Sequence, residues 1–267
     1  MLDRRTAPWG DTIWFEPSDI SLDPQFLETG VSWPRELDAL AAIVRPGDLV
    51  IDAGASLGYL TCYLAHLAGP SGRVHAIEPS TAMADLLERN VTGNGYSNVT
   101  IARLALGARD GHVDLWLSSS NLGRHSFYPA NVLNLGGSEL VEQLTADQYW
   151  RQRLACRPVG LLKLDVEGAE QVILGSASGL LSACREVWME FWPEGIAAAG
   201  GDPYDALTLL LRSGFALTGW DLVTGEHQPV SDPRDLEAVF TRLARWVIED
   251  GQDLSPILYI HAHRSRE

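Results

Sequence analysis

Short apolar runs of strand length alternate along this chain with segments whose apolar residues recur at helical spacing. In residues 34–44, Leu37, Leu40 and Val44 recur three or four positions apart, and the apolar run 49–52 follows at once. The same criteria predict further strands at 73–77, 99–104, 161–166, 187–191, 215–220 and 257–262, and further helices at 59–68, 81–92, 169–181 and 204–211. This alternation predicts an α/β fold with a doubly wound, largely parallel sheet and helices on both of its faces.

Three segments interrupt the alternation. Residues 1–33 carry aromatic side chains among prolines and acids, which predicts an ordered N-terminal arm. Residues 119–158 are rich in Ser, Asn and Gly and predict a lid insertion over the site, with a short helix at 137–144. Residues 223–254 predict a helical insertion, because an amphipathic pattern runs through 236–248.

The length of 267 residues is enough for one α/β domain with a large core. We therefore expect a single domain over 1–267, in which 1–46 form the arm and the first helix. Residues 47–222 and 255–267 would then form the core. The Asp-Gly pair at 110–111 lies between two apolar segments and predicts a hairpin turn.

The composition excludes several classes of protein. A formal net charge of −15, without a run of Lys or Arg, argues against nucleic acid as a partner and favours a small-molecule acceptor. An apolar run of 18 residues is absent and the first residues do not resemble a signal peptide, so we expect a cytoplasmic protein without a membrane span. Three scattered cysteines, Cys62, Cys156 and Cys184, predict reduced thiols rather than disulfides or a metal knuckle.

The glycine-containing turn after the strand at 49–52 predicts a cofactor site. Asp52 precedes Gly54 and Gly58, whose backbone could pass close to a ligand at the start of a helix, and Glu78 ends the next strand, where a carboxylate can bind two ribose hydroxyls. A dinucleotide site requires G-x-G-x-x-G, which this turn lacks. An acid inside the turn repels a pyrophosphate but suits the ammonium group of S-adenosylmethionine, directly or through water. The pattern therefore favours S-adenosylmethionine.

Two other functions stay open at this point. One is a nicotinamide-dependent oxidoreductase on a related fold, which the spacing of the turn and the absence of an evident hydride-transfer pair disfavour. The other is a scaffold that binds the cofactor without catalysis. Neither oligomeric state nor the identity of the acceptor follows from the sequence.

Four blocks of the sequence, in order, resemble a known family. They are DAGASLG at 52–58, AIEP at 76–79, LALG at 104–107 with DG at 110–111, and LKLDVEGAE at 162–170. Over about residues 45–193 the chain resembles the FkbM family of S-adenosylmethionine-dependent methyltransferases. The resemblance implies a Rossmann-like class I methyltransferase fold with a mostly parallel seven-stranded sheet in the order 3-2-1-4-5-7-6. It also implies O-methylation of a hydroxyl on a natural product, sugar or lipid-like acceptor.

The same resemblance implies roles for individual residues. The turn would hold the methionine end of the cofactor, Glu78 the ribose, and residues 104–106 the adenine, while Asp165 would face the transferred methyl group. The expected cofactor-binding residues are Asp52, Gly54, Ala55, Ser56, Gly58, Glu78, Pro79, Leu104, Ala105, Leu106 and Asp165.

Methyl transfer requires alignment of the acceptor and removal of its proton. Asp165 is the first candidate for the base or orienting group, with Glu190, His125 and Glu167 in reserve. The acids Asp165, Glu167 and Glu190 could also hold Mg²⁺ or Ca²⁺ through oxygen ligands. Acids at strand ends often serve helix caps and cofactors instead, so no metal is expected here.

Specificity for the acceptor would come from the lid and from aromatic side chains near it. Four tryptophans lie in segments that could close over the site, namely Trp14, Trp33, Trp150 and Trp192. Amphipathic rings at such positions shape a pocket and exclude water. They are expected to line the acceptor site.

Overall fold

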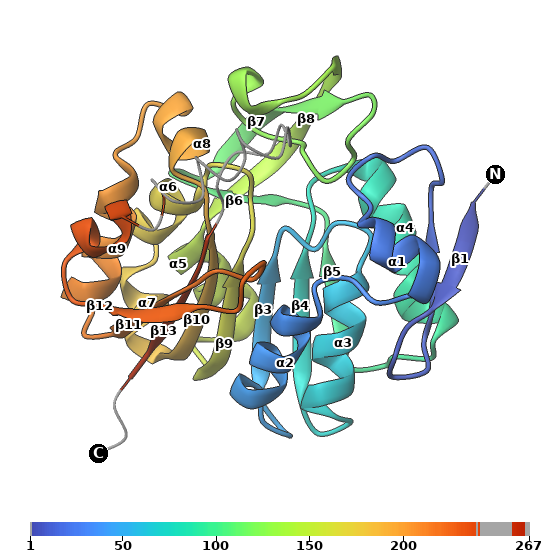
Figure 1. The fold of residues 1–267 in the computed structure, drawn as a ribbon, viewed down its shortest axis with the longest axis horizontal. Helices are drawn as coiled ribbons and strands as arrows, with labels where there is room; N and C mark the ends of the chain where they lie inside the picture. The colour runs from blue at the N-terminus through green and yellow to red at the C-terminus, as the bar shows by residue number, and fades with distance from the viewer. Residues whose placement is uncertain (1, 239, 241–257, 265–267) are drawn as a thin grey trace.

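The computed structural model describes residues 2–238, 240 and 258–264 (Figure 1). Among these residues, eight strands form a central sheet. From one edge to the other they are β12 (His227–Val230), β11 (Ala216–Trp220), β13 (Leu258–His263), β10 (Cys184–Phe191), β9 (Val159–Leu164), β3 (Leu49–Ala53), β4 (Arg73–Ile77) and β5 (Val99–Ala102). The five strands from β10 to β5 are mutually parallel, and β13 is antiparallel to both β10 and β11.

The order of the strands confirms the expected topology. Read from β5, the sheet runs β5-β4-β3-β9-β10-β13-β11, which is the order 3-2-1-4-5-7-6 when these strands are numbered along the chain. The expected count of seven is wrong by one, because β12 pairs antiparallel with β11 at the edge. β12 lies inside the predicted helical insertion at 223–254. Its short sequence contains Pro229 and gives no alternating apolar signal, which is typical of an edge strand.

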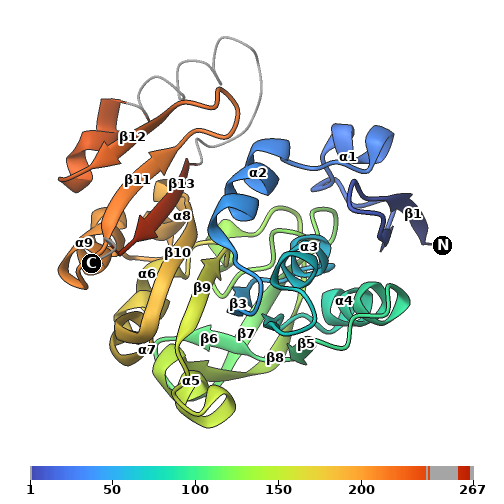
Figure 2. The same cartoon turned by 90° about the horizontal axis from the view of Figure 1, so that it is seen from below.

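Helices cover both faces of the central sheet (Figure 2). Successive side chains of a strand point to opposite faces. Val50 of β3 accordingly packs with Leu40 and Leu64, whereas its neighbours Leu49 and Ile51 pack into the cluster on the other face. The first face carries α2 (Pro34–Ile43), α3 (Tyr59–Ala68) and α4 (Thr81–Gly93). The second face carries α5 (Ala146–Leu154), α6 (Glu170–Gly175), α7 (Ser178–Ala183) and α9 (Pro203–Arg212).

The N-terminal arm is ordered, as predicted. It consists of the hairpin β1 (Asp3–Thr6) and β2 (Thr12–Phe15), followed by α1 (Pro24–Thr29). The buried Asn90 side chain of α4 fixes this arm, because its Oδ1 accepts the Trp14 N–H at 2.7 Å and its Nδ2 donates to the carbonyls of Trp14 and Leu57. One amide therefore joins the arm, the glycine turn region and α4.

A second, three-stranded sheet corrects two predictions. Its order is β6 (Ala105–Gly107), β8 (Leu135–Thr145) and β7 (Gly111–Ser118). Residues 137–144 are thus part of a strand, although a helix was expected there. Val141 and Gln143 are buried while Leu140 is 71% exposed, which is the alternation that pairing with β7 imposes. The Asp-Gly turn at 110–111 also does not form a hairpin, since β8 lies between β6 and β7.

Several other boundaries differ from the prediction. With β8 and α5 in regular structure, the irregular parts of the expected lid are 119–134, which includes the short 3-10 helix η1 (Pro129–Asn131), and 155–158. The helix expected at 169–181 is broken into α6 and α7. The remaining short elements are α8 (Pro193–Ala198) and η2 (Pro233–Leu236). Most of the helix expected at 236–248 lies outside the described residues.

Two further findings concern membrane-spanning helices and the cysteine side chains. No helix in the described part of the chain combines the length and the apolar character that a membrane span needs. All three cysteines are free, with Cys62 and Cys184 buried and Cys156 exposed.

Gly54, the first residue after β3, makes the closest approach between the glycine turn and β9. Its φ is +78°, and a Cβ at this position would lie 1.7 Å from the carbonyl oxygen of Asp165. The N–H groups of Gly54 and Ala55 both donate to the carbonyl of Ile77, at 3.0 and 3.1 Å. The turn therefore lies directly on the ends of β4 and β9, and only glycine fits there.

Replacement of Gly54 by alanine should destabilise the protein by more than about 2 kcal/mol, because the methyl group meets backbone in a left-handed conformation. Chemical denaturation measures this free energy of unfolding. Gly93→Ala is the matched control: Gly93 ends α4, and a Cβ there has no atom within 4 Å. The control should unfold at the same or slightly higher denaturant concentration. Equal stability of the two variants would contradict the packing described here.

Candidate active site

A cavity of about 680 Å³ opens at the carboxyl ends of β3, β4, β9 and β10. Ligands of open α/β sheets bind at this edge, where the strand order reverses. The expected site residues that line it are Gly54, Ala55, Ser56, Glu78, Pro79, Leu104, Ala105, Leu106, His125, Asp165, Glu167 and Glu190. Among the expected cofactor-binding residues, Asp52 and Gly58 do not line it.

Asp52 lies behind the cavity wall. Its side chain is fully buried, and its Oδ1 forms an ion pair with Lys163 Nζ at 3.1 Å while its Oδ2 accepts the Thr61 hydroxyl at 2.6 Å. Lys163 Nζ also donates to the Gly54 carbonyl at 3.2 Å and lies 3.6 Å from Asp165 Oδ2. Asp52 therefore orients Lys163 and the glycine turn from behind the wall, and its expected contact with the cofactor stays a prediction. The sequence could not reveal the ion pair, because the lysine lies more than a hundred positions away.

Burial lowers the pKa of Lys163, but the charges of Asp52 and Asp165 outweigh it and raise the pKa above its ordinary value. The ammonium group is therefore charged although its side chain is only 2% exposed. Gly58, the other residue outside the cavity, is the N-cap of α3 with φ +90°. A Cβ on Gly58 would lie 2.6 Å from the Leu87 side chain, so its role is the packing of α3 against α4.

Glu78 presents a buried carboxyl group to the cavity. Its Oε2 accepts the Ser56 N–H at 2.8 Å, and its Oε1 accepts the Ser80 N–H at 2.9 Å. Burial raises the pKa of Glu78 to about 7, against the two backbone N–H groups, which lower it. Each oxygen keeps a lone pair, so the group can accept two more hydrogen bonds, as from a diol.

The apolar part of the cavity lies beside Glu78. Leu104, Ala105 and Leu106 are each at most 3% exposed. Leu104 directly precedes β6, and Ala105 and Leu106 are its first two residues. Their place in the cavity wall suits a flat ring, since it offers carbon atoms and no charge. The wall thus offers a carboxyl group and, next to it, an apolar slot. These features are complementary to a ribose group and to its attached base.

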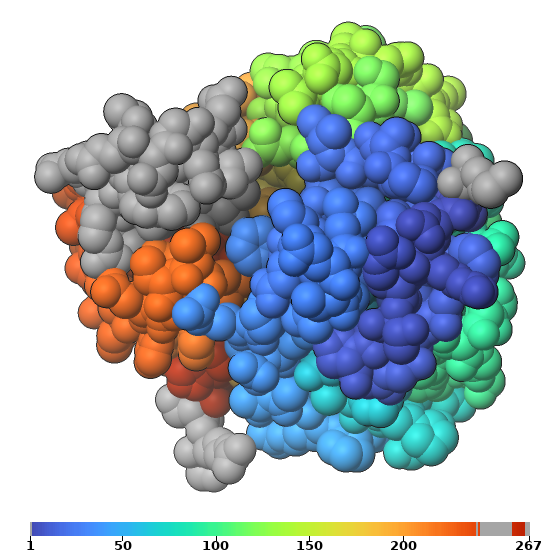
Figure 3. Space-filling model, turned by 45° about the vertical axis from the view of Figure 1, so that its right-hand side comes forward, coloured from blue at the N-terminus to red at the C-terminus, as the bar shows by residue number. Residues whose placement is uncertain are grey.

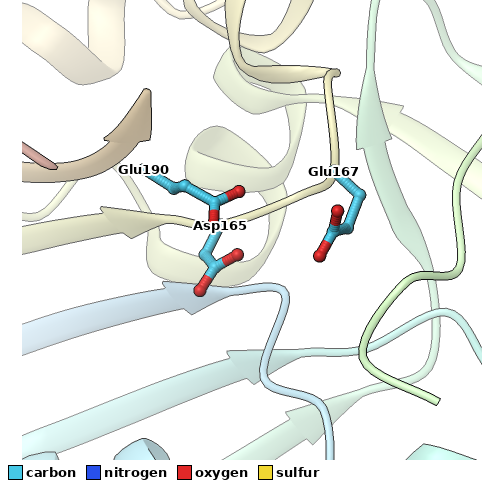
Figure 4. Close-up of side chains that lie close together, drawn as sticks. All are labelled: Asp165, Glu167 and Glu190. Carbon is cyan, nitrogen blue, oxygen red and sulfur yellow. The ribbon is translucent and has the colours of Figure 1, made fainter. Parts of the chain in front are cut away.

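Three carboxyl groups lie together at the other end of the cavity (Figure 4). Asp165 follows β9, Glu167 follows two residues later with φ +55°, and Glu190 lies near the end of β10. One oxygen of each lies within 4.8 Å of the others. Asp165 has the most exposed side chain at 25%, compared with 16% for Glu167, and Glu190 is 7% exposed.

Burial and the charge of Asp165 raise the pKa values of Glu167 and Glu190 well above the ordinary range. The positive charge of the Arg124 guanidinium acts in the opposite direction and lowers the pKa of Glu167, since Arg124 Nε lies 3.7 Å from Glu167 Oε2. Glu190 Oε2 is buried and has no hydrogen-bond partner among the described residues. The cluster thus combines strong mutual repulsion with an unsatisfied acceptor.

Comparison with known families identifies the family to which this chain belongs. The profile of the methyltransferase FkbM domain matches residues 52–215, which is more than half of the chain. The chain belongs to the FkbM methyltransferase family. The matched domain is a methyltransferase domain, so the nicotinamide alternative is set aside. The match includes the glycine turn, Glu78 and all three acids of the cluster.

Curated relatives of this FkbM methyltransferase are distant. Methyltransferase 1 of Beauveria bassiana is 27% identical over 185 residues, covering 63% of this chain and 72% of that protein. The protein-L-isoaspartate O-methyltransferase of Ignicoccus hospitalis is 38% identical over 61 residues, which is 23% of this chain. That match covers 29% of the Ignicoccus protein, and a similar one covers 21% of the Aeropyrum pernix protein, so the chain spans less than a third of either.

Solved structures give weak similarities. An S-adenosylmethionine-dependent O-methyltransferase of Thermotoga maritima superimposes with a TM-score of 0.47 at 16% identity, covering 99% of this chain and 78% of that one. Fibrillarin of Aeropyrum pernix, solved with S-adenosylmethionine, gives a TM-score of 0.45 at 12% identity, covering 98% and 97%. The family assignment of this FkbM methyltransferase therefore rests on its sequence, and the strand order agrees with the class I methyltransferase fold.

His125 lines the cavity, but its tautomer does not suit a base. The Ser118 N–H donates to His125 Nδ1 at 3.1 Å. Because a backbone N–H can only donate, the neutral imidazole carries its proton on Nε2. Burial lowers the pKa of His125, which favours this neutral form. Nε2 of His125 can therefore donate a hydrogen bond to a ligand in the cavity. Because it already carries the proton, it is not suited to accept another.

Among the polar residues of the cavity wall that sequence reasoning missed are Lys163, Glu36 and Arg124. Burial raises the pKa of Glu36 to about 7, and its Oε1 accepts the Trp188 Nε1–H at 2.9 Å. Arg124 lies over the ring of Trp192, with 4.4 Å between Cζ and the ring centroid. Only Lys163 had a signal in the sequence, because a lysine inside an apolar strand must find a partner.

The N-terminal arm and the 119–134 segment meet over the cavity. The Ile20 N–H donates to the Ser120 carbonyl at 2.9 Å, and the Leu122 N–H donates to Asp19 Oδ1 at 2.9 Å. Figure 3 shows this junction, where blue N-terminal residues lie against the green residues of the β7–β8 region. We call these two segments, residues 19–33 and 119–134, the roof of the cavity.

Of the four tryptophans expected near the acceptor, Trp33 lines the cavity. Trp14, Trp150 and Trp192 do not. Trp14 lies beneath the Arg89 guanidinium on the arm, and Trp150 donates its Nε1–H to the Arg157 carbonyl. Their rings pack structural elements together, so the expected role in the pocket is wrong for these three.

The raised pKa of Glu78 predicts that stability falls as the pH rises. The unfolded glutamate ionises near 4.5 and the folded one near 7, so the folded state is penalised progressively between these values and fully above 7. Between about pH 5 and about pH 8, this effect lowers the free energy of unfolding of the wild type by about 2 kcal/mol. In Glu78→Gln this decrease should be absent when unfolding is measured with denaturant at the two pH values. The exposed Glu142→Gln is the control and should keep the wild-type slope. An unchanged slope in Glu78→Gln would contradict the burial of a neutral carboxyl group.

Proposed function

We propose that this FkbM methyltransferase transfers the methyl group of S-adenosylmethionine to a hydroxyl oxygen of a small-molecule acceptor. The proposal rests on one observation: two groups of residues, which we call the cofactor wall and the acid cluster, line the same cavity. The turn at 54–56 and Glu78 form the cofactor wall, and Asp165, Glu167 and Glu190 form the cluster. A cofactor in this cavity would bring its methyl group between the two.

The proposed positions follow the chemistry of the walls. Glu78 accepts hydrogen bonds from the two ribose hydroxyls, and the wall at 104–106 packs on the adenine. The methionine end follows the turn at 54–56 towards Lys163 and Glu36, whose opposite charges suit a carboxylate and an ammonium group respectively. Asp52 supports this end from behind through Lys163.

The proposed reaction is an in-line displacement. The acceptor oxygen attacks the methyl carbon, the carbon–sulfur bond breaks, and S-adenosylhomocysteine leaves with the electron pair. The oxygen becomes strongly acidic as the new carbon–oxygen bond forms, so a carboxylate is a sufficient base. Asp165 receives the proton in this proposal because it has the most exposed side chain of the three acids.

The walls of the cavity favour a small acceptor with an apolar part. Four large apolar residues that line the mouth are 44–60% exposed, which is unusual for side chains of this size: Ile20, Trp33, Leu133 and Val223. An acceptor with a hydroxyl at the acid cluster and an apolar body at the mouth would cover them. The net charge of −15 and the acids at the floor disfavour RNA, whose phosphates they repel.

Labelled cofactor tests the class of acceptor. The full chain is incubated with methyl-labelled S-adenosylmethionine and three separate pools, namely hydroxylated metabolites, peptides that contain isoaspartate, and ribosomal RNA. We expect label in the metabolite pool and a carbon-13 methyl resonance typical of an ether. Label confined to peptide or RNA, or an N-methyl product, would overturn the proposal.

Asp165→Asn tests the base. Loss of the proton acceptor should lower kcat by at least about a hundredfold, while S-adenosylhomocysteine, measured by calorimetry, should bind within about threefold of wild type. Asp114→Asn, an exposed acid on β7, is the control and should keep the wild-type kcat. An unchanged kcat in Asp165→Asn would remove Asp165 from this role.

A further inference from the structure

We propose that Asp165, Glu167 and Glu190 bind one hard divalent cation, of the kind of Mg²⁺ or Ca²⁺, and that this cation holds the acceptor through two oxygens on adjacent carbons. The cation site stands on the geometry of the cluster alone. Its use for the acceptor rests on the proposed function. The acceptor class that follows is a vicinal diol, as in a sugar, instead of any isolated alcohol.

The spacing of the three carboxylates fits such an ion. Oxygen ligands lie about 2.1 Å from Mg²⁺ and about 2.4 Å from Ca²⁺, so two ligands on opposite sides are about 4.2 or about 4.8 Å apart. One oxygen from each of the three side chains lies within 4.8 Å of the others. Three oxygens within 4.8 Å of one another lie within about 2.8 Å of a common point, so side-chain movements of less than about 1 Å bring them to the distances that either ion requires.

A second observation points to a ligand at this place. Glu190 is 7% exposed, its Oε2 is buried without a hydrogen-bond partner among the described residues, and Figure 4 shows its carboxyl group beside that of Asp165. A buried acceptor without a donor costs about 1–3 kcal/mol, so such a group is normally satisfied by something that binds there. A cation between the carboxylates satisfies Glu190 Oε2 directly.

The charges around the cluster leave room for a cation. The ion pairs that the described residues make with it are those of Arg124 with Glu167, at 3.7 Å, and of Lys163 with Asp165, at 3.6 Å. Lys163 is closer to Asp52 than to Asp165, and Glu190 has neither partner. Three carboxyl groups thus face one guanidinium, whose side chain is 25% exposed, and one shared ammonium group, and a divalent ion would neutralise the remaining charge.

The geometry also leaves positions open for the acceptor. The three carboxyl groups belong to Asp165 and Glu167 in the loop after β9 and to Glu190 of β10, and all three line the cavity. Mg²⁺ and Ca²⁺ take six or more oxygen ligands, so at least two positions remain for acceptor oxygens or water. A bound hydroxyl is polarised by the ion and gives up its proton more readily. The second oxygen of Asp165 stays available for that proton.

Binding of the metal alone tests the site without any turnover. Calorimetry with Mg²⁺ and Ca²⁺, and loss of the free Mn²⁺ signal in electron paramagnetic resonance, are measured on the full chain without acceptor. We expect one ion per chain with a Kd of about 1 mM or lower. Glu190→Gln and Glu167→Gln should each weaken binding at least about tenfold, since each removes one charged ligand. Glu142→Gln, an exposed glutamate outside the cavity, should bind as wild type.

Absence of binding, or equal binding by the wild type and both cluster variants when thermal unfolding shows that these are folded, overturns the cation site. Methyl transfer then separates the two proposals. We expect transfer to a vicinal diol to fall at least about tenfold in a chelator and to recover on addition of the metal. Transfer to hydroxyls that is unaffected by chelation leaves the proposed function standing and overturns the role of the cation. Metal binding without transfer to any hydroxylated small molecule overturns the proposed function and leaves the cation site standing.

Discussion

The ammonium group of Lys163 is the interaction on which both halves of the site depend. It lies in the middle of the sheet, where burial of a charge is costly unless opposite charges and acceptors surround it. Ion pairs with Asp52 Oδ1 and Asp165 Oδ2 and a hydrogen bond to the Gly54 carbonyl provide these contacts from β3, from the residue after β9 and from the glycine turn. Since one group orients the turn and Asp165 together, the cofactor wall and the acid cluster have a fixed relation. A change at either side is transmitted to the other through this lysine.

The sequence predicts the parts of this fold whose signals are local. The strand at 49–52, the glycine turn and the helix at 59–68 follow one another directly, and the structure has β3 and α3 at these places. The strand β8 was missed, because Leu140, Val141 and Leu144 have a spacing that also suits a helix and only pairing with β7 decides between the two. The ion pair of Asp52 with Lys163 was not predicted for a similar reason, since the lysine is distant in the chain.

The acid cluster shows what spacing can and cannot reveal. Asp165 and Glu167 belong to one conspicuous block, and Glu190 ends another strand on the same edge, so their shared location was predictable. The approach of all three to within 4.8 Å was not, because it depends on the φ of +55° at Glu167 and on the register of β9 against β10. The orphan oxygen of Glu190 is likewise a property of three-dimensional packing and leaves no mark on the sequence.

The two segments of the roof differ in how they relate to the family. Residues 19–33 precede the part of the chain that matches the FkbM domain, whereas residues 119–134, the glycine turn and the acid cluster lie within that part. The Ile20 N–H bond to the Ser120 carbonyl uses main-chain atoms alone, whereas the Leu122 N–H bond requires the carboxylate of Asp19. One wall of the pocket therefore lies partly outside the sequence that defines the family, while the glycine turn and the acid cluster lie inside it.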